Sequence, residues 1–268
     1  MHGTKLFFPS PLGEGFSGGE GMLETETHNS EKVLSIAQNV ARVQERMRQA
    51  ARRVGRDPAR VRLVAASKTV DAARIRAAIA AGVTILGENY LQEARDKIGQ
   101  LGRHGVEWHL IGTLQRNKVR YMFDLFDMMH SLDALPLAEE INRRGERLGR
   151  RMAVLLEVNV GGELTKSGFD AETLLAEAHK LAQLKNLQVR GLMTIPPPTV
   201  HPEGARPFYR QVRELRDRLV HQEIEGLEWQ ELSMGMTADF EVAIEEGATL
   251  VRVGTAIFGA RPPAAHHG

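Results

Sequence analysis

The stretch VRLVAASKT, residues 61–69, indicates the fold class of this chain. Residues 63–66 form the continuous apolar run that is typical of a strand buried on both faces of a parallel sheet. Lys68 follows where that strand ends, and α/β proteins place ligand chemistry at the carboxyl ends of their strands. Taken alone, Lys68 is more simply interpreted as a lysine whose stem covers the rim of the sheet.

On either side of this strand, strand and helix patterns alternate along the chain. The apolar periodicity predicts strands over residues 61–67, 84–86, 108–111, 128–131, 153–160, 188–194, 231–233 and 250–253. Helices are predicted over residues 71–81, 89–98, 114–123, 135–148, 171–184, 205–221, 238–246 and 255–259. Eight strand–helix units predict a single TIM (β/α)8 barrel of the α/β class. A doubly wound open sheet is the alternative, but it does not require eight units.

The ends of the chain differ in composition from this alternating region. Residues 1–28 are rich in glycine and proline, and we predict a disordered tail there, with Met22 as an alternative start. A helix is predicted over residues 30–55, before the first strand. The barrel domain is therefore predicted over residues 29–261, and residues 262–268 form a short C-terminal tail.

Composition excludes several function classes. The chain has 268 residues, a net charge of +1 and no cysteine. Disulfides, thiolate catalysis and cysteine-ligated metals are excluded, and the histidines show no metal-ligand spacing. The near-zero net charge gives no indication of nucleic acid or a membrane surface as a partner. We expect a cytoplasmic protein.

Two glycine-containing turns follow the last two predicted strands. SMGMT, residues 233–237, has a hydroxyl at each end, and RVGTAI, residues 252–257, leads into the last helix. TIM barrels bind phosphate with the loops after strands seven and eight. Either turn alone is more simply explained by the conformational needs of glycine, but together they favour a phosphate site. With Lys68 and Arg252 at the same mouth, the residues suggest a phosphorylated cofactor that carries an aldehyde.

At this point a specific resemblance appears, over about residues 30–261. Seven segments resemble, in order, the motifs of the pyridoxal phosphate homeostasis protein family: VAASKT (64–69), GENYLQE (87–93), WHLIGTLQRNK (108–118), HSLD (130–133), EVNVGGELTKSGF (157–169), GLMTIPP (191–197) and LSMGMTADFEVAIEEGATLVRVGTAIFG (232–259). The resemblance implies a fold-type III barrel, like the N-terminal barrel of alanine racemase, with pyridoxal 5′-phosphate as the cofactor.

The resemblance also implies roles for individual residues. Lys68 is expected to form the internal aldimine, and Arg252 to face the pyridine nitrogen. The resemblance implies that the cofactor phosphate is held by Ser233, Gly254 and Thr255. Asn89 and His109 are expected on the ring side of the pocket, and Met234 is expected to contact the cofactor near the phosphate loop. Asn159 and Met193 are further candidates, and for Met193 core packing is an equally good explanation.

The implied function is intracellular vitamin B6 homeostasis without established catalysis. An arginine at the pyridine nitrogen disfavours ring protonation and so weakens carbanion chemistry. Alanine racemase supplies a catalytic tyrosine from a second domain, whereas the three tyrosines here lie in the barrel segment. We therefore expect no enzyme activity, PLP-dependent apoenzymes as partners, and a monomer. The alternatives are a PLP-dependent amino-acid racemase or decarboxylase on a minimal barrel, and a barrel that binds another phosphorylated metabolite.

Overall fold

The computed structural model describes residues 20–162 and 167–260, with side chains described from residue 35 onward. Its centre is a closed barrel of eight parallel strands that pair in chain order. The strands are β1 (Arg62–Ala66), β2 (Ile85–Glu88), β3 (Glu107–Leu110), β4 (Met128–Leu132), β5 (Met152–Glu157), β6 (Leu187–Met193), β7 (Glu231–Ser233) and β8 (Leu250–Val253). The last strand closes the ring on the first, with Val64 opposite Arg252. The predicted TIM barrel is confirmed.

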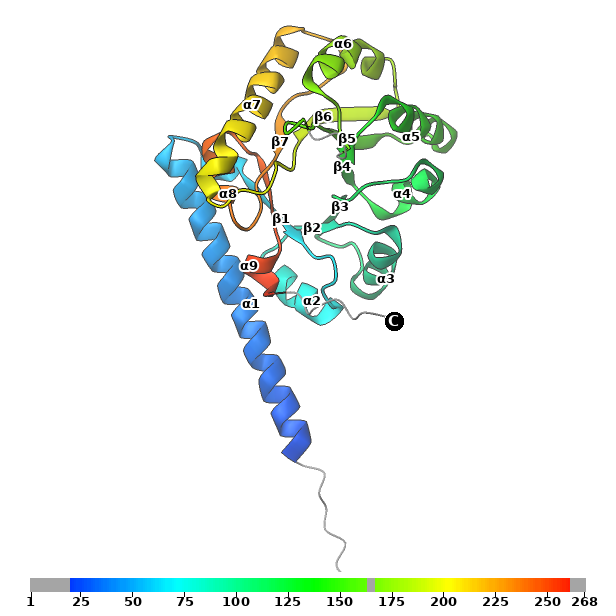
Figure 1. Cartoon of the computed structure of the whole chain (residues 1–268). Helices are drawn as coiled ribbons and strands as arrows, with labels where there is room; N and C mark the ends of the chain where they lie inside the picture. The colour runs from blue at the N-terminus through cyan, green and yellow to red at the C-terminus, as the bar shows by residue number, and fades with distance from the viewer. Residues whose placement is uncertain (1–19, 163–166, 261–268) are drawn as a thin grey trace, which may run out of the picture.

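Helices surround the barrel on its outside (Figure 1). The α-helices are α1 (Glu20–Arg53), α2 (Ala72–Ala80), α3 (Leu91–Leu101), α4 (Val119–Leu125), α5 (Leu135–Leu148), α6 (Ala171–Ala182), α7 (Arg206–His221), α8 (Phe240–Glu245) and α9 (Thr255–Phe258). The described residues also form the short 3-10 helices η1 (Pro58–Arg60), η2 (Arg116–Lys118) and η3 (Pro202–Ala205). Among the described helices, none has an apolar stretch long enough to span a membrane.

Two element boundaries differ from the sequence prediction in ways that affect the barrel mouth. The strand predicted over residues 153–160 ends at Glu157, because Val158 leaves the sheet to form a bridge with Phe169. The Val158 carbonyl oxygen accepts a 2.9 Å hydrogen bond from Thr194 Oγ1, which fixes this departure. The helix predicted over residues 114–123 is divided into η2 and α4.

Helix α1 begins at Glu20, ten residues before the predicted start at residue 30. Residues 20–28, which the sequence assigned to the tail, are helical in the structure. They contain no proline, and Leu23, Glu24 and Glu26 are good helix formers. Residues 1–19 and 261–268, which hold the rest of the two predicted tails, lie outside the described residues.

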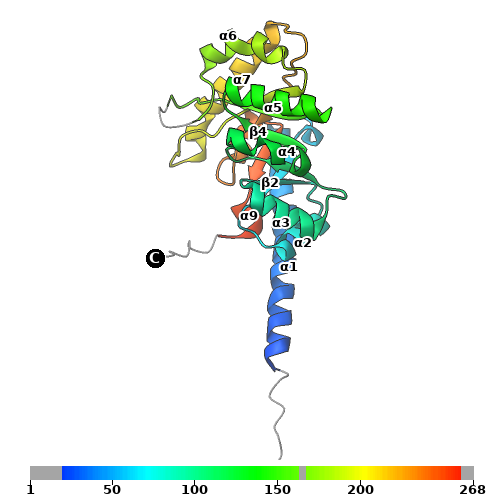
Figure 2. The same cartoon turned by 90° about the vertical axis from the view of Figure 1, so that its right-hand side faces the viewer.

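The C-terminal part of α1 packs along the barrel beside α8, α9 and α2, whereas its N-terminal part extends past it (Figures 1 and 2). Ile36, Val40, Val43 and Met47 recur at helical spacing and are buried. On the flank of this contact, Arg46 forms two 2.8 Å hydrogen bonds with the Glu241 carboxylate of α8. Helix α1 therefore supports the helices that follow β7 and β8.

The barrel interior holds both apolar and polar side chains. Its apolar cluster consists of Val64, Ile85, Met128, Leu155, Met193 and Leu250. Beside this cluster, four polar side chains are also buried inside the barrel: His109, His130, Ser233 and Arg252. The larger apolar core lies between the barrel and the helices. Buried polar groups need hydrogen-bond partners, so chemistry is expected around these four polar side chains.

Candidate functional site

Lys68 lies in the turn that follows β1, at the carboxyl mouth of the barrel. Its side chain is half-buried, and the next residue, Thr69, has a φ angle of 64°. A positive φ is costly for a β-branched residue, so neighbouring contacts must hold the turn. One such contact is a short hydrogen bond from the Thr69 backbone N–H to the Glu93 carboxylate.

Lys97 of α3 provides the main support beneath this turn. Its ammonium donates to the Ser67 carbonyl oxygen at 2.6 Å and to the carboxylates of Glu88 and Glu93 at 2.7 Å each. The Glu88 carboxylate also accepts a 2.6 Å hydrogen bond from Ser67 Oγ. Burial raises the pKa of Glu88, and the hydrogen bonds from Lys97 and Ser67 oppose that effect. This cluster could not be predicted from the sequence, because Lys97 has the spacing of an ordinary helix-surface charge.

The turns after β7 and β8 meet at the same mouth. Arg252 N donates to the Gly235 carbonyl oxygen at 3.0 Å, and Ala256 N approaches Thr237 Oγ1 at 3.5 Å. The Ala256 amide, at the start of α9, is thereby directed toward the turn after β7. A Cβ added to Gly254 would lie 3.1 Å from the Ala66 carbonyl oxygen. The predicted phosphate turn is therefore adjacent to the end of the strand that leads to Lys68.

Arg252 is held rigidly beneath this junction. Its Nη1 donates to the Ser233 carbonyl oxygen at 2.7 Å and to Ser233 Oγ at 2.6 Å, while Nη2 donates to the Thr194 carbonyl oxygen at 2.8 Å. Only 5% of Arg252 is exposed. Burial lowers its pKa, and the negative charge of Glu157 opposes that shift. The guanidinium thus has a fixed direction and remaining donor capacity for a ligand above it.

The two buried histidines connect Ser233 to the opposite end of the barrel. His130 Nδ1 lies 2.9 Å from Ser233 Oγ, and His130 Nε2 lies 2.9 Å from His109 Nδ1. His109 Nε2 in turn lies 3.1 Å from the carboxylate of Glu107, the first residue of β3. His109 therefore lies within the barrel interior. His130 belongs to the HSLD segment, but the sequence analysis gave it no role.

The other predicted site residues lie around this centre. Asn89 opens into a cavity of about 540 Å³ that is lined by the loops after β2 and β3. Met234 is fully buried in the core outside the barrel, whereas Met193 belongs to the apolar cluster inside it. Asn159 follows β5, and its N–H donates to the Phe169 carbonyl oxygen at 3.0 Å. Their cofactor contacts remain predictions.

Glu157 is the acidic group of interest at the end of β5. Burial and the negative charge of Asp133 raise its pKa to about 7, although Arg252 opposes this effect. Within residues 20–162 and 167–260, acidic and histidine side chains form no group suited to a metal ion.

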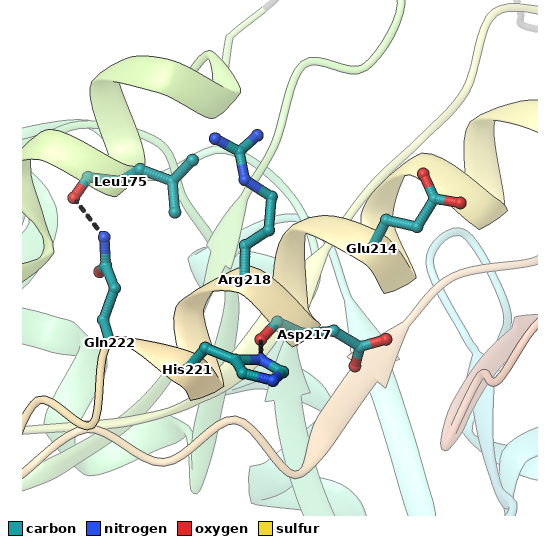
Figure 3. A pocket seen from close by; sticks show the side chains of 6 residues that line it. All are labelled: Leu175, Glu214, Asp217, Arg218, His221 and Gln222. Atoms are coloured by element: carbon teal, nitrogen blue, oxygen red, sulfur yellow. Dashed lines mark hydrogen bonds between the residues drawn. The ribbon is translucent and has the colours of Figure 1, made fainter.

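A surface pocket lies away from these residues, between α6 and α7 (Figure 3). Figure 3 shows its lining residues: Leu175, Glu214, Asp217, Arg218, His221 and Gln222. Gln222 Nε2 donates to the Leu175 carbonyl oxygen, and His221 Nδ1 contacts the Asp217 carbonyl oxygen. None of the residues that the sequence assigned to a site lines this pocket, so it is separate from the barrel mouth.

Comparison with known proteins places this geometry in a family. Residues 38–262 match the family model described as "Alanine racemase, N-terminal domain". A pyridoxal phosphate homeostasis protein of Pseudomonas aeruginosa is 46% identical over 227 residues, which cover 85% of this chain and 96% of the relative. The protein of the same name from Aquifex aeolicus is 48% identical over 180 residues, covering 67% of this chain and 78% of the relative.

A solved structure agrees with these matches. PipY of Synechococcus elongatus, described as having PLP bound, is 39% identical and superposes with a TM-score of 0.73. The match covers 84% of this chain and 100% of PipY. Sequence, fold and the order of the mouth residues lead to one conclusion: this chain belongs to the pyridoxal phosphate homeostasis protein family, which is built on the alanine racemase N-terminal domain.

Proposed function

We propose that this chain binds pyridoxal 5′-phosphate at the carboxyl mouth of its barrel and serves intracellular vitamin B6 homeostasis. The observation that carries the proposal is the contact between the Gly254 turn and Ala66, which brings the anion-binding turns beside the strand end that bears Lys68. The PLP bound to PipY, at 39% identity, supports the same ligand for this chain.

The donor set fits each part of this cofactor. Amides at the start of α9 and the Thr237 hydroxyl suit a phosphate, because helix N-termini favour anions. Ser233 faces Arg252 and His130, so its hydroxyl orients the arginine beneath the turn. Arg252 suits the pyridine nitrogen, and Lys68 provides the amine. When bound, the cofactor supplies an aldehyde that condenses with a lysine amine.

We also propose that the chain holds the cofactor without turnover. The relatives are named as homeostasis proteins. A permanently charged guanidinium beneath the ring disfavours ring protonation, and a protonated ring is what most strongly stabilises carbanions. Delivery to PLP-dependent apoenzymes, a monomeric state and a cytoplasmic location remain predictions.

One observation favours the alternative of an amino-acid racemase or decarboxylase. The Glu157 carboxyl, with a pKa of about 7, is suited to proton transfer near neutral pH. Incubation of the PLP-loaded protein with a panel of amino acids in deuterium oxide separates the two functions. We expect the unmodified chain to exchange the α-proton of the amino acids no faster than the Glu157→Gln control. Exchange by the unmodified chain that Glu157→Gln abolishes would instead establish catalysis.

The binding proposal is tested by titrating the full chain with PLP, reducing it with borohydride and mapping the modified lysine by mass spectrometry. We expect stoichiometric modification of Lys68 and loss of the absorbance band in Lys68→Ala. Lys185→Ala, which removes an exposed lysine after α6, is the matched control and should bind normally. Unchanged binding by Lys68→Ala would overturn the assignment.

A further inference from the structure

A continuous hydrogen-bonded chain runs through the barrel from its amino end to Arg252. Its members are Glu107, His109, His130, Ser233 and Arg252, and the distances between successive polar atoms are 3.1, 2.9, 2.9 and 2.6 Å. Both histidines are fully buried. The Glu107 side chain is 55% exposed at the start of β3. The chain therefore links a solvent-facing carboxylate to a buried arginine.

The carboxylate at one end sets the direction of each hydrogen bond. An ionised carboxylate only accepts, so His109 Nε2 must carry a hydrogen and, in the neutral ring, Nδ1 accepts. His130 Nε2–H then donates to His109, and His130 Nδ1 accepts from the Ser233 hydroxyl. The Ser233 oxygen is left with its lone pairs toward Arg252 Nη1, which donates to it.

A neutral His130 ring agrees with the surroundings of the chain. Burial lowers the pKa of His130 well below its usual value, and the charges of Arg252 and Arg62 act in the same direction. The hydrogen bond from His109 lowers the pKa of Glu107, with a further contribution from Arg62. Glu107 is therefore ionised at neutral pH.

The geometry points to Glu107, His109 and His130 as positioning residues that orient the Ser233 hydroxyl and thereby fix Arg252 at the cofactor site. The Ser233 hydroxyl donates its hydrogen to His130. Its oxygen and the Ser233 carbonyl oxygen therefore both accept hydrogen bonds from Arg252. This inference rests on the proposed function for its effect on PLP. The hydrogen pattern itself does not depend on any cofactor.

The first measurement is long-range ¹H–¹⁵N NMR of the histidine rings in the full chain without added cofactor. We expect His109 and His130 as neutral Nε2–H tautomers, assigned with His109→Gln and His130→Gln. A Nδ1–H tautomer or an imidazolium at either ring at pH 7.5 would overturn the chain. This result is independent of whether PLP binds.

The second measurement is PLP affinity in two variants of the exposed end. Glu107→Leu removes the acceptor, so we expect affinity to fall by roughly three- to tenfold, the size of one ordinary hydrogen bond. Glu107→Gln keeps an acceptor oxygen and should stay within about twofold of the unmodified chain. Glu225→Leu, an exposed carboxylate in the loop before β7, is the matched control.

These measurements distinguish the positioning role of Glu107 from the proposed binding of PLP. Equal affinity in Glu107→Leu and Glu225→Leu would overturn the positioning role. Absence of PLP binding by the unmodified chain would instead overturn the proposed function. The histidine tautomers would still test the directions of the hydrogen bonds between Glu107 and Arg252. Retained near-UV circular dichroism in Glu107→Leu shows that a lost affinity does not come from unfolding.

Discussion

The Lys97 ammonium lies 2.6 Å from the carbonyl oxygen of Ser67, the residue immediately before Lys68. Lys97, which is buried, thus supports the backbone that presents the half-buried Lys68. It also pairs with two carboxylates, and only 6% of its surface is exposed.

Replacing Lys97 with methionine tests this support. Lys97→Met leaves the buried Glu88 carboxylate without its cation, so we expect the free energy of unfolding to fall by about 3–5 kcal/mol. Urea denaturation measures this change. Lys180→Met, which removes an exposed lysine paired with Glu177 on α6, should cost less than about 1 kcal/mol. Equal losses in the two variants would contradict a structural role for Lys97.

Arg252→Lys tests the importance of the planar guanidinium. Lysine keeps the charge but cannot hold the Ser233 and Thr194 oxygens in one fork. We expect PLP affinity, measured by fluorescence quenching, to fall at least about tenfold, because charge-assisted contacts of this kind contribute 1.5–3 kcal/mol each. Arg60→Lys in η1, which is exposed, provides the control. Similar affinities in both variants would show that charge alone is sufficient.

Gly235→Ala tests the close packing of the turn after β7. The new Cβ would lie 2.5 Å from the Ala243 Cβ, and the φ angle of Gly235 is +91°. We expect a loss of stability of about 2–4 kcal/mol from strain and overpacking together. Gly55→Ala has a similar positive φ but no atom within 4 Å, so it measures the backbone cost alone. A thermal unfolding midpoint as high as that of Gly55→Ala would rule out the steric contribution.

Glu157→Gln tests the raised pKa of the Glu157 carboxyl through the pH dependence of stability. The folded carboxyl has a pKa of about 7 and the ordinary value is 4.5, so between these values the folded chain holds a proton that the unfolded chain has released. Stability must therefore decrease as pH rises through this range, and above it the buried charge is destabilising.

Glutamine stays neutral, so we expect Glu157→Gln to exceed the unmodified chain in stability at pH 8 by up to about 3 kcal/mol. The advantage should shrink toward pH 5, as followed by urea denaturation at several pH values. The exposed carboxylate of Glu172 serves as control in Glu172→Gln, where no such trend is expected. A stability difference between Glu157→Gln and the unmodified chain that stays constant across pH would contradict the raised pKa of Glu157.

The barrel was predictable because its signals are local. The apolar run of β1 and the strand–helix alternation give eight units, and the position of Arg252 on β8 follows from strand alternation. The start of α1 was placed ten residues too late because the glycines and prolines before residue 20 weighed on the prediction for residues 20–29. The contact between His130 and Ser233 was not predictable, since it depends on how β4 and β7 face each other across the closed barrel. The contacts of Lys97 were also not predictable, because its hydrogen-bond partners come from three separate elements of the fold.

The first helix has a consequence for how this protein is made. The Asn39 amide donates to the Ile257 carbonyl oxygen at 3.1 Å, across 218 positions of sequence. On the ribosome, the apolar stripe of α1 emerges long before α8 and α9 exist to cover it. Contacts this distant form late, and exposed apolar surface invites aggregation in the meantime. The apolar stripe of α1 is therefore covered completely only when translation is nearly finished.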